Sequence, residues 1–392
     1  MNNNSNSMFF MYYLLKFNKP KITIILKYTE LHYQIALTLL NGVGAIKAKE
    51  LAEKLDQLER LFVDSPLVLQ SKTDFPKAFI SKMGRKKALE KSISVAESLK
   101  NHRIESTFYN DNDFPHRLKN CVDSPVLLFR KGILNLNPQK IISIVGTRSA
   151  TNYGKEICSE FIASIQGKGI SVVSGMAHGI DAMIHRLCLK YDVPTVGVMG
   201  HGLDRVYPAV HRELASKMIL NNCLLSEFIP GVMPDRENFP KRNRIVAGMS
   251  DATIVIESKK RGGSLITANL ANDYNRDVFA YPGSVHMETS QGCNYLIAGQ
   301  KAHLIQSSEE FLKFMSWEQS KNLSKTVQKS LFIELSNTQR SIVDCIQKNN
   351  TIQIDLLSIQ LEIPISKLNQ ELFHLEMKSI VRSLPGKVYK VA

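Results

Sequence analysis

The sequence predicts an α/β protein built on a doubly wound, mostly parallel, extended Rossmann-like sheet. Three observations predict it: three apolar runs with the character of buried strands, a glycine-bearing turn directly after each run, and a helical pattern after each turn. Crossovers of this length require parallel strands, and ligands of such sheets bind beyond the carboxyl ends of the strands. We therefore expect the three turns to open into one crevice. The runs are 141–145, 170–173 and 252–256, and the turns are Gly146–Ser149, Ser174–Asp181 and Arg261–Ser264.

The N-terminal third is expected to hold an extension and a helical domain. Residues 1–27 form the extension, whose apolar stretch 8–15 is too short to span a bilayer and lacks the flanks of a signal peptide. Translation could start at Met1, Met8 or Met11. Residues 28–105 have apolar positions at helical spacing, with Gly42-Val43-Gly44 between two helices. This resembles a helix-hairpin-helix (SAM-like) turn that faces phosphate, and an ordinary tight turn explains it equally well.

The remaining chain is expected to form the sheet domain at 106–306, a polar linker at 307–329 and a winged helix at 330–392. An edge strand near 125–129 precedes the sheet strands 141–145, 170–173, 195–198, 223–226, 252–256 and 277–280. In the last part, helices at 338–347, 354–361 and 365–378 precede strands at 380–383 and 388–391. The third helix mixes Glu371 and Glu376 with lysines, so protein contact or packing is as well supported as duplex binding.

Composition favours a polyanionic partner. The 392 residues include 50 Lys and Arg against 36 Asp and Glu, for a net charge of +14. No basic amphipathic helix or lipidation signal is apparent, so nucleic acid is favoured over a membrane surface. The six scattered cysteines form no C-x-x-C pair, which predicts reduced thiols in a cytoplasmic protein and no metal site.

The first turn has the chemistry of an anion site. Thr147 and Arg148 place a hydroxyl and a guanidinium at the start of a helix, where backbone N–H groups also face the ligand. The sequence has neither the G-x-G-x-x-G dinucleotide fingerprint nor a P-loop, so no nucleotide cofactor is predicted.

Asp181 and His185 lie one helical turn apart, after the second glycine turn. Such a pair can act as general acid and base or supply half of a metal site. No third ligand or nucleophile is spaced to join them, so we favour a helix cap at Asp181 and a core histidine at 185.

Arginines recur near the expected crevice. In the triplet Arg242-Asn243-Arg244 both arginines are expected to point to the rim, and structural ion pairing with Glu227 or Glu237 is the rival interpretation. The third turn, Arg261-Gly262-Gly263-Ser264, repeats the combination of basic residue and glycine. Arginines around one crevice, without a pair of carboxylates, indicate a groove that reads phosphates rather than a hydrolytic site.

The ordered motifs resemble the DNA-processing protein A family (DprA, also called Smf) over nearly the whole chain. They are Ile144–Arg148, Tyr153-Gly154, Ser174–Asp181 with His185, Gly202–Asp204, Tyr207-Pro208, Ser226-Glu227, Phe239–Arg244, Gly262–Thr267, Pro282-Gly283 and Gly292–Asn294. The resemblance implies a cytoplasmic, non-enzymatic homodimer that binds and protects single-stranded DNA and helps to load RecA recombinase on it during natural transformation.

The resemblance also implies the DNA-contacting residues. The family's pocket falls on Thr147, Arg148, Ser174, Arg242, Asn243, Arg244, Arg261, Gly262, Gly263 and Ser264. Departures are His178, where the family more often has Arg, Asn222, where Gly is usual, and Gly262, where Ser is common.

Two alternatives belong to other classes. Nucleotide phosphoribohydrolases have a related sheet and a P-G-G-x-G-T-x-x-E run, but the corresponding stretch 261–270 contains no Glu. A duplex-binding regulator would use the winged helix for DNA and the sheet as a sensor.

Overall fold

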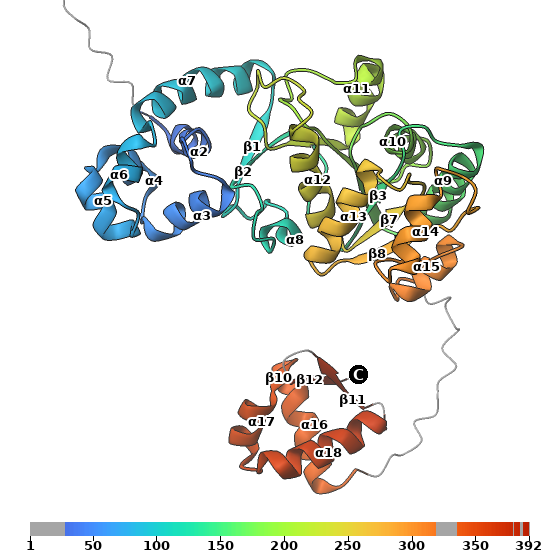
Figure 1. Cartoon of the computed structure of the whole chain (residues 1–392). Coiled ribbons are helices and arrows are strands. Elements are labelled where there is room, and N and C mark those ends of the chain that lie inside the picture. The colour runs from blue at the N-terminus through green and yellow to red at the C-terminus, as the bar shows by residue number, and fades with distance from the viewer. Residues whose placement is uncertain (1–27, 319–334, 379, 385–386, 392) are drawn as a thin grey trace, which may run out of the picture. The chain divides into compact units, whose positions relative to one another are not determined.

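The computed structural model describes residues 28–318, 335–378, 380–384 and 387–391. The chain divides into two units, residues 1–319 and 320–392 (Figure 1). The expected extension 1–27, with its alternative start residues, lies outside the described residues, as do residues 319–329 of the expected linker.

A nine-stranded sheet forms the centre of the first unit. Its order is β1-β2-β6-β5-β4-β3-β7-β8-β9, and every pair from β6 to β9 is parallel. The predicted mixed α/β fold with a mostly parallel sheet is confirmed, and the six expected strands of the parallel part are present. The strands are β1 Glu105–Phe108, β2 Leu127–Gly132, β3 Lys140–Val145, β4 Ile170–Ser174, β5 Thr195–Val198, β6 Cys223–Ser226, β7 Ala252–Val255, β8 Asp277–Ala280 and β9 His303–Leu304.

Both faces of the sheet are covered, which is why its strands are continuous apolar runs rather than alternating ones. Side chains of β3 alternate between two cores: Ile142 and Ile144 face one, and Ile141 and Val145 face the other. Helices α9 (Asn152–Ile165), α10 (Ile180–Lys190) and α15 (Ser308–Phe314) pack into the first core. Helices α11 (Arg212–Asn221), α12 (Asn238–Gly248), α13 (Gly263–Asp273) and α14 (Gln291–Ala298) pack into the second (Figure 1).

Two expectations about the borders of this unit were wrong. The strand expected at the sheet edge, β2, lies between β6 and β1 and is antiparallel to both, so β1 forms the edge. The first part of the expected linker is helix α15, because Phe311 and Leu312 are buried against the sheet and Ser307 caps the helix start.

The region between Tyr28 and Ile104 contains six helices. Its longest helix, α7, is followed along the chain by β1 and then by the short helix α8 (His116–Lys119). Gly42 adopts a left-handed φ of 70° in the turn between the first two helices, a conformation that favours glycine. The helices are α2 Glu30–Thr38, α3 Ala45–Lys54, α4 Leu58–Val63, α5 Pro66–Thr73, α6 Lys77–Lys82 and α7 Arg85–Asn101.

The second unit contains three helices and a small sheet, with the expected helices and hairpin strands all present. Its sheet has the order β10-β12-β11, and β10 was not predicted. Ile342, Leu357, Leu368 and Leu372 form its core. The elements are α16 Asn337–Asn349, β10 Ile352–Gln353, α17 Ile354–Leu361, α18 Ile365–Met377, β11 Val381–Leu384 and β12 Val388–Val391.

Candidate nucleic-acid interface

A large cavity lies where the strand order reverses. Strands β3 and β7 are neighbours, and the helices that follow them cover opposite faces of the sheet. The loops after the two strands therefore diverge, and a crevice opens between them. A cavity of about 1000 Å³ occupies this place, lined by the first turn, by parts of the second, by α12 and by the start of α13.

A buried carboxylate joins the two diverging loops. Glu257, which follows β7, accepts hydrogen bonds from the backbone N–H of Thr151 at 2.9 Å and from its hydroxyl at 2.7 Å. Its carbonyl oxygen also accepts from the N–H of Thr147 at 2.8 Å. Gly154 leaves room for this carboxylate, because a Cβ there would lie 2.2 Å from Oε2. The width of the crevice is thus set by hydrogen bonds within the protein.

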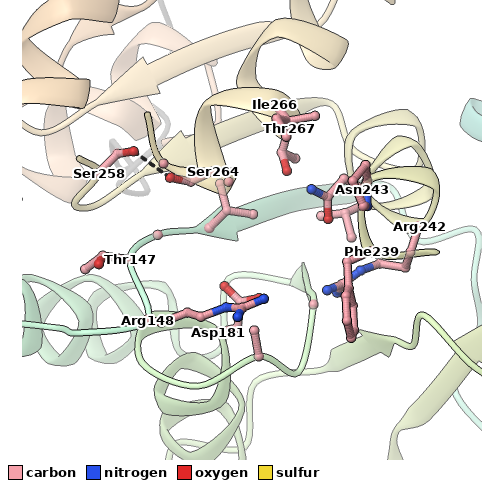
Figure 2. Close-up of a pocket in the computed structure, with 18 of the residues that line it drawn as sticks. Thr147, Arg148, Asp181, Phe239, Arg242, Asn243, Ser258, Ser264, Ile266 and Thr267 are labelled. Carbon is pink, nitrogen blue, oxygen red and sulfur yellow. Dashed lines mark hydrogen bonds between the residues drawn. The ribbon is translucent and has the colours of Figure 1, made fainter. Parts of the chain in front are cut away.

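The first turn contributes the free cation that the sequence predicted. Arg148 is exposed, lines the cavity, and has no carboxylate within 4.0 Å in the part of the chain that the structure describes. Its guanidinium carbon lies 6.0 Å from the ring centroid of Phe239 (Figure 2). Thr147 lines the same wall, and its carbonyl accepts from the N–H of Ile180 at 3.1 Å.

Ser174 does not face the cavity. It is buried at the end of β4, and its hydroxyl donates to the carbonyl of Ile144 at 2.6 Å. The expectation that it contacts a ligand is not supported by this placement. Gly175, Ala177 and Asp181 line the cavity from the same turn.

Arg242 and Asp181 form a buried charged wall of the cavity. Arg242 is 4% exposed, and its Nη1 donates to the carbonyl of Val198 at 2.8 Å. Burial raises the pKa of Asp181, and the facing Arg242 opposes that rise. Gly175 permits the approach, because a Cβ there would lie 1.8 Å from Nη1 of Arg242 and 2.6 Å from Oδ2 of Asp181.

The two arginines of the triplet point in different directions, which corrects the prediction for Arg244. Arg244 forms an ion pair with Glu227 and donates to the carbonyl of Asp123, with both charged side chains 14% exposed. The triplet lies within α12, where residues two positions apart differ by about 200° in direction. Arg242 and Asn243 line the cavity, whereas Arg244 turns away and the rival ion pair with Glu227 is confirmed.

The third turn meets the cavity at the start of α13. Arg261 is exposed and, like Gly262, Gly263 and Ser264, lines the cavity. The Ser264 hydroxyl donates to Oγ of Ser258 at 2.8 Å (Figure 2). Gly262 directly precedes the helix. A side chain at this position would have no room, because a Cβ would lie 2.4 Å from the Ser258 hydroxyl. The first N–H groups of an eleven-residue helix therefore face the cavity beside a guanidinium.

Two aromatic rings were missing from the predicted site. Tyr207 is 51% exposed, and its ring centroid lies 6.1 Å from that of Phe239, with the ring planes inclined by 31°. Both rings line the cavity. Both rings belong to motifs noted in the sequence, Tyr207-Pro208 and Phe239–Arg244. Only the charged residues near the crevice were predicted to bind a ligand, so no role was predicted for the two aromatic side chains.

His185 is a core residue, as favoured from the sequence. It is fully buried, and its Nδ1 lies 2.8 Å from the hydroxyl of Thr195. Burial lowers the pKa of His185 to about 3. Asp181 is not the helix cap that was expected, because Gly179 precedes α10 and Asp181 lies within its first turn. Among the described residues, no three His, Cys, Asp or Glu side chains are placed to hold a metal ion.

The fold and the cavity define a Rossmann-like α/β protein with a cavity at its switch point that exposed arginines line. No helix in the described ranges has the length and apolar character needed to cross a membrane. The family model for DNA recombination-mediator protein A matches residues 105–316, and the chain belongs to this family.

Relatives and solved structures agree with this assignment. The chain is 34% identical to Protein Smf from Synechocystis over 277 residues, 69% of either chain, and 38% identical to DNA processing protein DprA from Bacillus subtilis over 56% of this chain and 74% of that one. The X-ray structure of DprA from Streptococcus pneumoniae matches with a TM-score of 0.55 and 31% identity, covering 69% of this chain and 98% of that chain. DprA from Helicobacter pylori matches with a TM-score of 0.50 and 26% identity over 55% and 96%; that structure is described as giving the protein's single-stranded DNA binding mode.

Proposed function

We propose that this protein binds single-stranded DNA in the switch-point cavity. The observation that carries the proposal is the combination of exposed guanidiniums with two aromatic rings, the exposed Tyr207 and the half-buried Phe239, around one space of about 1000 Å³. Single-stranded nucleic acid offers both a phosphate chain and unpaired bases, and proteins bind it with cations and stacking rings together. Membership of the recombination-mediator family and the single-stranded DNA binding of the Helicobacter pylori relative support the proposal.

Each wall of the cavity has its own part in this binding. Arg148, Arg261 and the first N–H groups of α13 take phosphates, while Tyr207 and Phe239 stack on bases. Thr147, Asn243, Gly262, Gly263 and Ser264 contact the strand between these points. Every contact of this kind goes to the backbone or to a ring face, so binding is largely independent of sequence.

Arg242, Arg244 and Ser174 act mainly as supports in this proposal. The guanidinium of Arg242 is buried beside Asp181 and holds this wall of the cavity in place. Because Arg242 lines the cavity, its charge still adds positive potential there. Arg244 holds α12 to the loop after β6 through Glu227, and Ser174 holds β4 to β3. Their substitution is therefore expected to lower stability before it lowers affinity.

The wider role follows from the family resemblance. We propose a non-enzymatic cytoplasmic protein that acts as a homodimer through its central domain and helps to load RecA recombinase on single strands during natural transformation. Within the described residues, Asp181 is the one carboxylate that lines the cavity, and it is buried beside Arg242, which supports binding rather than catalysis. We also propose that residues 28–105 act as a helix-hairpin-helix domain and 330–392 as a winged helix, separated from the sheet domain 106–306 by a linker.

Fluorescence anisotropy with a labelled oligothymidine tests the proposal. Arg148→Ala and Arg261→Ala should each weaken binding about tenfold and reduce the slope of log affinity against log salt by about 0.7 per lost phosphate contact. Lys217→Ala, an exposed lysine on α11 outside the cavity, is the control and should bind like the wild type. Equal affinities for all four proteins would contradict the proposal.

A further inference from the structure

The helical region contains a short repeat that the proposed function does not use. Residues 44–50 and 84–90 share the pattern Gly-x-x-Lys-Ala-x-Glu. Each glycine directly precedes a helix, α3 or α7, so the repeated lysines, Lys47 and Lys87, both occupy the third helical position. The repeated alanines, Ala48 and Ala88, are both buried. One local design therefore occurs twice, forty residues apart in the sequence.

The two copies lie side by side. The N–H of Asn41, in the turn before α3, donates to the carbonyl of Met83, in the turn before α7, at 2.9 Å. A Cβ on Gly84 would lie 3.0 Å from the side-chain amide of Asn41. Gly42 and Gly84 both have a left-handed φ, 70° and 71°, whereas Gly44, which aligns with Gly84 in the repeat, has a φ of −85°. The two turns thus share their lysine positions but not their backbone geometry. We call the surface that they form, with Gly44, Lys47, Lys86 and Lys87, the hairpin face.

The hairpin face is strongly basic. Lys47, Lys86 and Lys87 are exposed, as are the neighbouring Lys77 and Lys82. None of the five has a carboxylate within 4.0 Å among the described residues, although Lys54 and Lys72 of the same region do. A hollow of about 580 Å³ opens at the start of α7, where Arg85, Lys86 and Lys87 line it together with Phe62, Ser81, Gly84 and Glu90. Glu90 is the acidic side chain of this hollow, and the surrounding lysines and Arg85 outnumber it, so the face keeps a net positive charge.

The backbone at the start of α3 is also open. Gly44 has a φ of −85°, which any residue adopts, and a Cβ at this position would meet no atom within 4 Å. The fold itself therefore does not require a glycine there. No side chain caps α3 or α7, so the first N–H groups of both helices remain accessible beside the lysines.

We propose that the hairpin face binds the sugar-phosphate backbone of duplex DNA, with one turn on each strand. Two neighbouring turns with a lysine at the same helical position suit a ligand with two phosphate chains, which a duplex presents and a single strand does not. Among the described residues, the hairpin face has no aromatic ring as exposed as that of Tyr207: Phe62 and Phe79 are half-buried, and the Nζ of Lys47 lies 4.5 Å from the ring centroid of Phe79. This site is separate from the switch-point cavity and does not depend on the function proposed for it.

Two kinds of variant of the full-length protein test the site. Lys47→Glu/Lys87→Glu should weaken binding of a labelled 30-base-pair duplex at least tenfold and lower its salt slope by about 2, since two phosphate contacts are lost. Gly44→Asp should also weaken duplex binding. It should at the same time raise the thermal unfolding midpoint, because Asp is a good N-cap. Lys100→Glu/Lys301→Glu changes the net charge equally at exposed sites elsewhere and is the matched control.

The outcomes are distinct from those for the cavity. Oligothymidine affinity should change less than twofold in the hairpin-face variants, and Arg148→Ala should leave duplex affinity unchanged. Absence of duplex binding by the wild-type protein, or equal losses in the hairpin-face and control variants, would overturn the proposal. An equal loss of affinity for the duplex and for oligothymidine would overturn the proposal as well, because the hairpin face would then be part of the surface that binds single-stranded DNA.

Discussion

The substitution Arg244→Ala tests whether Arg244 stabilises the fold or contacts DNA. The substitution leaves the carboxylate of Glu227 buried without its cation, and Oε1 of Glu227 already lacks a hydrogen-bond partner. Breaking a buried ion pair costs about 3–5 kcal/mol, and we take about 3 kcal/mol because both side chains keep 14% exposure. The thermal unfolding midpoint should fall by roughly 6 °C or more for a unit of this size.

Circular dichroism melts and oligothymidine anisotropy at 15 °C provide the two measurements. Arg244→Met/Glu227→Gln should recover much of the lost stability, because no unpaired charge remains. Lys241→Ala removes one exposed positive charge from the same helix and serves as the control for binding. Both Arg244→Ala and Lys241→Ala should bind within about threefold of the wild type. A tenfold loss of affinity by Arg244→Ala at an unchanged midpoint would refute this interpretation.

Three further predictions concern the cavity and the core. Phe239→Ala should weaken oligothymidine binding by about 1–3 kcal/mol in anisotropy without changing its salt slope, because a stacking ring and no charge is lost; a changed slope would contradict this. Gly175→Ala should lower the free energy of unfolding in urea by about 2 kcal/mol or more, since the new Cβ displaces Arg242 from the carbonyl of Val198, and an unchanged urea midpoint would count against it. His185 has a pKa of about 3 in the folded protein against about 6.5 unfolded, so the unfolded state binds more protons and stability falls as the pH drops through this window. Between pH 7 and pH 5 this loss is about 2 kcal/mol, and His185→Asn should reduce it in urea titrations; a variant with the same pH dependence as the wild type would exclude His185 as its source.

The parallel strands could be predicted because each is a continuous apolar run with a marked end. Ile141–Val145 and Ile170–Val173 are buried on both faces, so burial alone defines them. Strands that depend on a partner were missed: β1 has an exposed end at Glu105, and β9 has only two residues, both exposed. Helix α15 was not predicted because its first turn is polar. Its contact with the sheet domain depends on two buried apolar residues, Phe311 and Leu312.

The sequence was sufficient to place a side chain at the cavity where the residue follows a strand, and insufficient where a helix sets its direction. Arg148 and Arg261 come directly from turns at the strand ends, and the structure places both at the cavity. Arg244 was misplaced because residues two positions apart on a helix differ by about 200° in direction, so the two arginines of the triplet cannot both face the crevice. Ser174 was misplaced because a strand residue at the carboxyl end still alternates between faces, and its hydroxyl is used within the sheet.

The hydrogen bonds of Glu257 have a consequence for the kinetics of binding. They connect the start of α9 to the loop after β7 within the protein, so both sides of the crevice are held at their distance before any ligand enters. A receptor that is rigid in this way needs no closing step after encounter. The observed association rate should then rise linearly with oligonucleotide concentration instead of reaching a plateau, and charge attraction at the mouth of the crevice should set its slope.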